Sequence, residues 1–174
     1  VRAAIDLPPG VPIVTDASSC TQSLRRMAKD WDVEVRDVVQ FAAAELLPRL
    51  SVVSPVASLA VHPTCSSTRA GMNDDLMKVA RFISDDVMVP DSWACCGFAG
   101  DRGLLHPELT RSATREMAAE LGGREFAAYA SLNRTCEIGM SQATGHTYLH
   151  ILELLARATR PPQDPPARGR LSWR

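Results

Sequence analysis

The chain has 174 residues, of which 45% are hydrophobic and 22% are charged, and its formal net charge is -1. This length is enough for one compact domain with a buried core. A net charge near zero provides no basic surface for nucleic acid or for an anionic membrane, and an aromatic content of 5% leaves few side chains on which bases could stack. No apolar run approaches the roughly 20 residues of a membrane-spanning helix. The composition therefore excludes nucleic-acid binding and a membrane span.

The start of the chain and its cysteines bear on its origin and compartment. The chain begins with Val1 rather than methionine, and no charged segment followed by an apolar one opens it, so secretion has no support. Five cysteines cannot all pair, and without a secretory signal clustered cysteines are more often metal-binding or redox-active than structural bridges. We expect a piece of a larger protein that is cytoplasmic, and peripheral at the inner membrane only through partners.

Short apolar runs alternate with segments of helical period along the chain. In chain order the pattern predicts a strand at 11–15, helices at 21–29 and 38–47, a strand at 58–61, a helix at 74–83, a strand at 87–89, a helix at 107–121, a strand at 126–132, a short helix from about 136 and a helix at 149–158. The helix at 107–121 is the clearest, because Pro107 stands at a permitted first position and two glycines follow its end.

This alternation predicts the fold class and the domain boundary. Strands that alternate with helices are typical of an α/β domain with three layers, in which a mainly parallel sheet has helices on both faces. We expect this domain to occupy residues 1–160. Residues 161–174 are rich in proline and arginine and are expected to form a disordered tail.

The cysteines share one position relative to the predicted strands. Each follows the carboxyl end of a strand: Cys20 the first, Cys65 the second, Cys95 and Cys96 the third, and Cys136 the fourth. Loops at the carboxyl ends of parallel strands gather along one edge of the sheet, where ligand sites form. The sequence therefore predicts that five thiols, far apart along the chain, converge at one edge.

The spacing of these cysteines favours one kind of ligand. Soft sulfur ligands select zinc, copper(I) or iron–sulfur clusters, and zinc sites usually pair their ligands as C-x2-C, a pattern that is absent here. The adjacent residues Cys95 and Cys96 reach two irons of a cluster more easily than one small ion. Gly97 lets the backbone approach inorganic sulfur, and Gly100 and Gly103 extend this amide-rich loop.

These residues resemble a known family. Cys65, the run Cys95–Gly97 and the run Cys136–Gly139 are similar to the CCG cysteine-rich domain, which occurs in heterodisulfide reductases, the glycolate oxidase iron–sulfur subunit and lactate-utilisation proteins. The runs DASSCT at 16–21, HPTCS at 62–66 and CCGFAGDRG at 95–103 resemble the C-terminal region of D-lactate dehydrogenases that contain FAD and iron–sulfur clusters. The resemblance covers about residues 11–158. Related domains with a non-cubane cluster usually end in C-x-x-C, whereas Gly139 takes the last position here.

The resemblance implies a function for the chain. The implied function is electron transfer by an iron–sulfur domain of a FAD-dependent D-2-hydroxyacid dehydrogenase, with D-lactate as the leading substrate. The implied cluster is 4Fe–4S, bound by Cys20, Cys65, Cys95, Cys96 and Cys136, with Gly97 and Gly139 beside it. The implied partners are a flavin domain and a ferredoxin-like domain of the parent chain, and a quinone or cytochrome as acceptor. The chain by itself is not complete for catalysis, and no catalytic residue is assigned.

Other interpretations of the same residues remain open. The thiols could hold zinc in a structural or docking module, or act as a redox sensor through a Cys95–Cys96 disulfide or a disulfide from Cys136. Free cysteines are also common as small buried hydrophobic residues. Cys20 lies outside the core motif, so its role as a ligand is the most open of the five.

Several neighbours of the cysteines have simpler roles. The four histidines (His62, His106, His146 and His150) are interpreted as packed or solvated side chains rather than ligands. Trp93 could shield a cluster from water or serve ordinary packing. Arg102 and Arg134 could offset cluster charge or form surface ion pairs.

Overall fold

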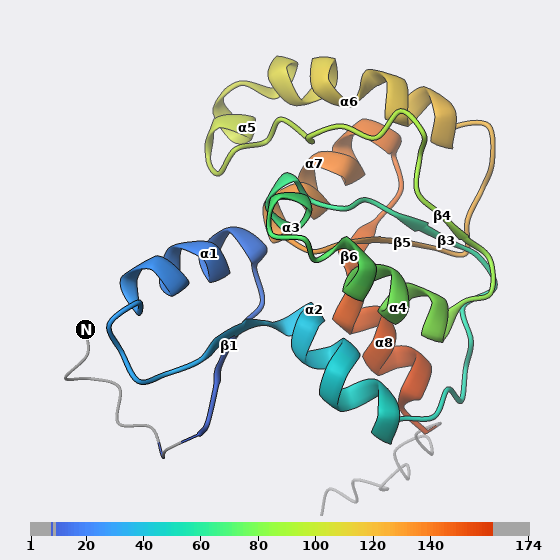
Figure 1. The fold of residues 1–174 in the computed structure, drawn as a ribbon. Coiled ribbons are helices and arrows are strands. Elements are labelled where there is room, and N and C mark those ends of the chain that lie inside the picture. The colour runs from blue at the N-terminus through green and yellow to red at the C-terminus, as the bar shows by residue number, and fades with distance from the viewer. Residues whose placement is uncertain (1–7, 9, 162–174) are drawn as a thin grey trace, which may run out of the picture.

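The computed structural model describes residue 8 and residues 10–161, so almost all of the expected tail at 161–174 lies outside the described residues. Figure 1 shows short parallel strands flanked by helices. In chain order the elements are β1 (Ile13–Thr15), α1 (Ser18–Met27), β2 (Val35–Asp37), α2 (Val38–Phe41), the π-helix η2 (Ala42–Leu46), the 3-10 helix η3 (Leu47–Arg49), β3 (Leu59–Val61), α3 (Cys65–Arg69), α4 (Asn73–Ile83), β4 (Val87–Met88), α5 (Arg102–Leu105), α6 (Pro107–Leu121), β5 (Ala128–Ser131), α7 (Arg134–Thr144), β6 (Tyr148–His150) and α8 (Ile151–Thr159).

The strands form two sheets, and every pairing in them is parallel. The larger sheet has the order β4-β3-β5-β6, with Leu59 of β3 opposite Ala128 of β5. The smaller sheet pairs β1 with β2. The first predicted strand was expected in the main sheet, but it lies in this smaller one. The three-layer α/β class is confirmed, but the strand before Cys20 belongs to a separate two-stranded unit.

Side chains alternate across the main sheet and supply two cores. Leu59 and Val61 of β3 point to one face, where they pack with α2, α4 and α8. Ala60 and Tyr129 point to the other face and pack with α6, α7 and the segment around Phe98. Both faces are therefore covered, as a parallel sheet requires.

The helices predicted from clear signals are confirmed, whereas short elements were missed. α6 has the bounds that its proline and glycines predicted, and the apolar face of α4 is buried. The strands β2 and β6 and the helices α3 and α5 have five residues or fewer, which is too short for a periodic pattern. The prediction of a helix from 149 was wrong at its start, because Tyr148–His150 is a strand.

A buried polar cluster joins the small sheet unit to the main one. The Ser18 hydroxyl at the start of α1 is 2.9 Å from the Thr64 hydroxyl and 2.5 Å from the Ser66 hydroxyl. The Ser18 backbone N–H donates to Asn133 Oδ1 at 3.0 Å, and Asn133 Nδ2 donates to Ser66 Oγ at 3.1 Å. Because Thr64 precedes α3 and Asn133 precedes α7, this cluster holds the first turns of three helices together.

None of the described helices is both long and apolar enough to cross a membrane.

Candidate metal centre

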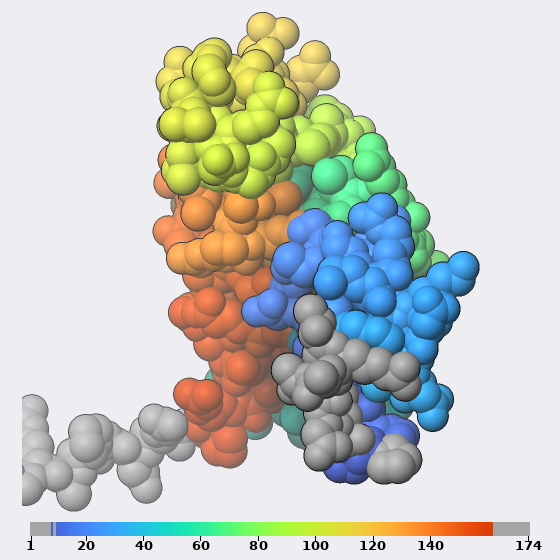
Figure 2. Space-filling view, turned by 90° about the vertical axis from the view of Figure 1, so that its left-hand side faces the viewer, coloured from blue at the N-terminus to red at the C-terminus, as the bar shows by residue number. Residues whose placement is uncertain are grey.

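The cysteines follow the carboxyl ends of strands, and three of them lie in the first turns of helices. Cys65 opens α3, Cys136 is the third residue of α7 and Cys20 is the third residue of α1. Only Cys95 and Cys96 lie in a loop, between β4 and α5, so the expectation that all five occupy loops was wrong. Figure 2 shows α1, α3 and α7 meeting on one face, with the yellow-green segment that contains α5 above them. Helix N-termini favour negative charge and hence the thiolate form of cysteine.

Four of the five thiols interact with one another. The Sγ atoms of Cys96 and Cys136 are 3.2 Å apart, and both residues are buried in the apolar core on the α6 and α7 side of the sheet. The Cys95 thiol is exposed, and the nearby Cys65 and Cys96 help to raise its pKa. The structure thus brings together residues that are up to 71 positions apart, from Cys65 to Cys136.

Mutual contact changes the acidity of these thiols. The hydrogen bond between the Cys96 and Cys136 thiols is the main reason why the pKa of Cys96 is lowered to about 7, against the opposing effect of burial. The same bond, together with burial, raises the pKa of Cys136. Burial raises the pKa of Cys95, and the charges of Cys65 and Cys96 add to the rise. Thiolates gathered in this way repel one another, so a bound cation or cluster would stabilise them.

Cys20 stands apart from this group. Its helix begins beside α3 and α7, but Ser18 and Thr21 occupy the buried face of α1 and leave the Cys20 side chain exposed. The first turn of α1 thus lies at the site, with the Cys20 thiol exposed to solvent.

The four thiols do not surround a single point in the manner of a zinc site. Across the described residues, no set of three or more His, Cys, Asp or Glu side chains is arranged to hold one metal ion. A cluster with several irons distributes its ligands over different metal atoms, so it does not require four sulfurs around one ion. The donor set, four thiols with adjacent backbone amides, fits the chemistry of such a cluster.

The loop that carries the adjacent pair Cys95 and Cys96, which we call the doublet, has a backbone conformation that requires glycine. Gly97 has a φ of 69°, and its N–H donates to Cys95 Sγ at 3.5 Å. A Cβ at this position would lie 2.8 Å from the Cβ of Ala113 on α6, closer than carbon atoms pack. Gly97 therefore allows the doublet to sit directly against α6.

Replacing Gly97 with alanine is expected to lower the free energy of unfolding by roughly 2–3 kcal/mol, through left-handed backbone strain and the clash with Ala113. Urea unfolding of the metal-free protein measures this value. In an Ala113→Gly background the same change should cost less, roughly 1–2 kcal/mol, because the clash with Ala113 is gone while the backbone strain and the 3.2 Å approach to the Leu109 carbonyl oxygen stay. An equal loss of unfolding free energy in both backgrounds would show that the close approach to Ala113 of α6 does not require a glycine at position 97.

Gly139 has a packing role that the sequence motif did not indicate. A Cβ there would lie 3.1 Å from the Phe98 ring and 3.3 Å from Thr110 Cγ2, so this glycine lets α7 approach α6. A cysteine at this position, as in a C-x-x-C ending, would require the buried Phe98 ring to shift. The departure from that ending is consistent with how these helices pack.

Two side chains bridge the cysteine loops: His62, which sequence analysis interpreted as a packed residue, and Trp93, for which it left cluster shielding and packing both open. The His62 ring is buried between Ser131 Oγ, 3.2 Å from Nδ1, and the Ala94 carbonyl oxygen, 3.2 Å from Nε2. Burial lowers the pKa of His62 to about 4, so at neutral pH the ring is neutral and Nε2 carries the proton donated to Ala94. Trp93 Nε1 donates to the Pro63 carbonyl at 2.6 Å. The sequence feature that could have indicated this role is their position, since His62 stands three residues before Cys65 and Trp93 two residues before Cys95.

The remaining histidines and Arg134 behave as expected of packed or surface residues. His146 stacks on Tyr129 with ring centroids 4.3 Å apart, and His150 Nδ1 accepts the Leu152 N–H at the start of α8. His106 is exposed and pairs with Glu108, and Arg134 pairs with Glu137 at 2.9 Å.

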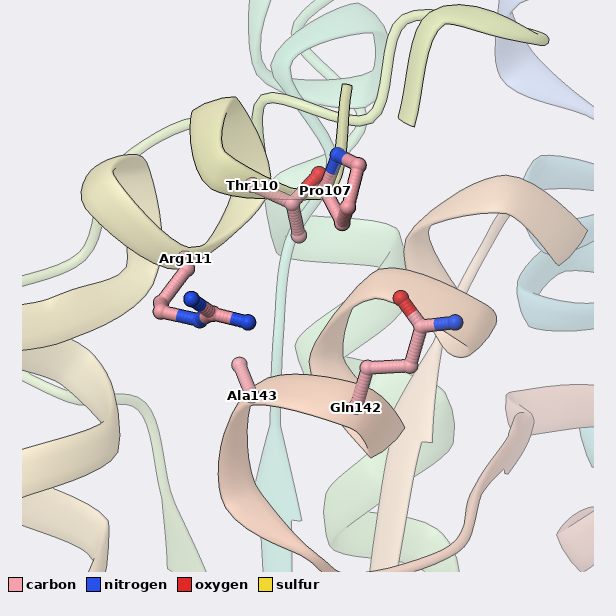
Figure 3. Close-up of a pocket in the computed structure, with 5 residues that line it drawn as sticks. All are labelled: Pro107, Thr110, Arg111, Gln142 and Ala143. Atoms are coloured by element: carbon pink, nitrogen blue, oxygen red, sulfur yellow. The ribbon is translucent and has the colours of Figure 1, made fainter. Parts of the chain in front are cut away.

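A separate pocket of about 430 Å³ lies between α6 and α7. Figure 3 shows Arg111 of α6 and Gln142 of α7 extending into this space from opposite sides, with Thr110 and Pro107 above them. None of the cysteines lines it. Thr110 Oγ1 is buried without a hydrogen-bond partner, but Figure 3 shows this oxygen turned toward Pro107 rather than into the space between Arg111 and Gln142.

Fold and site together define an α/β domain with a cluster of thiols at the carboxyl edge of a parallel sheet. The chain is 29% identical over 126 residues to the glycolate oxidase iron–sulfur subunit of Escherichia coli (strain K12). The match covers 70% of this chain and 30% of that subunit, so the chain spans less than a third of the relative's length. No family model matches the chain.

Proposed function

We propose that this domain binds an iron–sulfur cluster and transfers electrons within an oxidoreductase. The observation that carries the proposal is the 3.2 Å contact between the Cys96 and Cys136 thiols, with Cys65 and Cys95 close enough for their charges to affect the pKa of Cys136. These four residues come from three separate segments that each follow a strand. The similarity to an iron–sulfur subunit supports the same chemistry. Iron bound to these thiolates would supply a one-electron redox centre, and the protein would hold it at the sheet edge.

The chain's own residues would determine the environment of such a centre. The first turns of α3 and α7 place partial positive charge beside Cys65 and Cys136, which favours a negatively charged cluster. Burial of Cys96 and Cys136 keeps water from one side, whereas Cys95 is exposed on the other. Hydrogen bonding and solvent exposure are the main factors by which a protein adjusts a cluster's potential.

We propose the following finer assignments on the basis of the sequence motifs. The cluster is 4Fe–4S, Gly97 and Gly139 lie beside it, and Cys20 is a fifth ligand contributed by α1. The parent protein is a cytoplasmic, FAD-dependent D-2-hydroxyacid dehydrogenase that oxidises D-lactate. Electrons then pass from its flavin domain through a ferredoxin-like domain and this domain to a quinone or cytochrome. Association with the inner membrane would depend on that acceptor.

A thiol–disulfide switch is the second candidate function. The Sγ distance of 3.2 Å between Cys96 and Cys136, and a pKa of about 7 for Cys96, favour reaction between these two thiols over a vicinal Cys95–Cys96 disulfide. Such a switch would need an external oxidant, and it would leave Cys65 and Cys95 without a role.

Anaerobic purification followed by iron, sulfide and zinc assays and by optical and EPR spectroscopy separates these functions. We expect iron and acid-labile sulfide in comparable amounts, together with an EPR signal that appears or disappears on reduction. Zinc without sulfide would replace the proposal with a structural module. A metal-free protein with a reversible Cys96–Cys136 disulfide would establish the switch.

A further inference from the structure

We propose that His62 and Trp93 are positioning residues that fix the distance between Cys65 and the Cys95–Cys96 doublet before any cluster binds. The inference rests on the proposed function, because the distance matters only if these cysteines bind a cluster. The hydrogen bonds that fix it are present in the protein without metal. We call the two hydrogen bonds His62–Ala94 and Trp93–Pro63 the loop clamp.

The loop clamp is reciprocal. His62 Nε2 donates to the Ala94 carbonyl at 3.2 Å, and Trp93 Nε1 donates to the Pro63 carbonyl at 2.6 Å. Each loop therefore offers one side-chain donor and one backbone acceptor to the other. Cys65 lies two residues beyond Pro63, and Cys95 directly follows Ala94. A pair of crossed bonds this close to the cysteines leaves the two loops little freedom to slide or separate.

The strands do not provide this constraint. Pairing between β3 and β4 ends at Ala60 and Met88, so residues 62–64 and 90–94 lie beyond the ladder. In the described part of the chain, the two clamp bonds are the hydrogen bonds between these segments. Without them, the distance between the Cys65 and Cys95 thiols would depend on the loops alone.

Both ends of the clamp are anchored. The His62 N–H donates to the Ala130 carbonyl of β5 at 2.8 Å, and the Ser131 hydroxyl donates to the His62 carbonyl at 3.0 Å. Since β5 leads into α7 and Cys136, His62 connects all three cysteine-bearing segments. The doublet loop is held from the other side, because Glu120 of α6 accepts the Ser92 N–H at 3.0 Å.

The test measures distances between thiols in the metal-free protein. A bifunctional bimane reagent that bridges neighbouring thiols is added to the reduced protein, and peptide mass spectrometry quantifies the Cys65–Cys95 and Cys96–Cys136 cross-links separately. In His62→Leu and Trp93→Phe we expect the rate of the Cys65–Cys95 cross-link to fall by roughly fivefold, the factor for one net hydrogen bond. His62→Gln retains a donor that can reach Ala94 and should stay within about twofold of the wild type.

The Cys96–Cys136 cross-link is the internal control, because this pair is in the core and takes no part in the clamp. A variant that merely loosens the fold would change both cross-links together, and that result would overturn the inference. An unchanged Cys65–Cys95 rate in His62→Leu and Trp93→Phe would also overturn it. Failure of the proposed function is a different outcome, namely a wild-type protein that takes up no iron while these cross-linking rates behave as expected.

Discussion

Replacing Cys96 with serine is expected to abolish iron uptake by the reconstituted domain and to remove the stabilisation that iron provides. Cys96 is buried, adjoins Cys95 and contacts Cys136, so its loss affects ligands from two segments. A ligand that binds only the folded state stabilises it by about 2.7 kcal/mol when its concentration is 100 times Kd. For a domain of this size, that corresponds to a rise of roughly 5–10 °C in Tm, which should be absent in the variant.

The design must separate this effect from the cost of burying a hydroxyl group. Calorimetry on the iron-loaded and the metal-free forms of both proteins gives the increment in Tm due to iron, and only this increment is compared. Cys95→Ser should give the same loss with a smaller change in the metal-free form, because Cys95 is exposed. Iron content and iron-dependent Tm that are unchanged in both variants would reject the metal centre.

The exposed Cys20 provides a comparison within the same experiment. Lower iron content or an altered EPR spectrum in Cys20→Ser would support a fifth ligand from α1. Full iron content with the wild-type spectrum would reject the proposal for Cys20 and leave the four-thiol site in place.

In the full-length parent protein, Cys96→Ala is expected to block electron exit while sparing oxidation of the substrate. If hydride transfer to the flavin takes place in another domain, D-lactate should bleach the flavin at the wild-type rate in a stopped-flow experiment. Steady-state turnover with an acceptor that takes electrons from the cluster should collapse to background, because the relay is broken. Thr135→Ala, next to Cys136 but without a thiol, is a matched control that should support both steps.

The opposite pattern would contradict the relay. Slow flavin reduction with normal electron exit would mean that the domain shapes the substrate site. Normal rates in both steps would mean that electrons leave the flavin by another route. A second hydroxyacid, glycolate, tests the substrate assignment separately, because faster bleaching with glycolate than with D-lactate would reject D-lactate and leave the relay intact.

The fold class and the neighbourhood of the site were predictable from local patterns in the chain. Apolar runs at β3 and β5 alternate with amphipathic helices such as α4, and both patterns follow from local chemistry that tertiary contacts only reinforce. The position of each cysteine after a strand was equally predictable. It indicated a shared site, because the carboxyl ends of parallel strands lie at one edge of the sheet. The bounds of α6 followed from Pro107 and the glycines after Leu121.

Which thiols meet, and what holds them in place, depends on long-range packing. Cys20 and Cys136 each stand third in a helix, yet one is exposed and the other buried, because helix phase and the neighbouring layer determine which face is covered. The division into two sheets depends on β2, a three-residue strand with two charged side chains that no periodic pattern reveals. The loop clamp joins His62 to a backbone carbonyl 32 residues away. A bond of that kind leaves no periodic trace in the sequence, since any residue can supply the carbonyl and only the packed fold brings it to the ring.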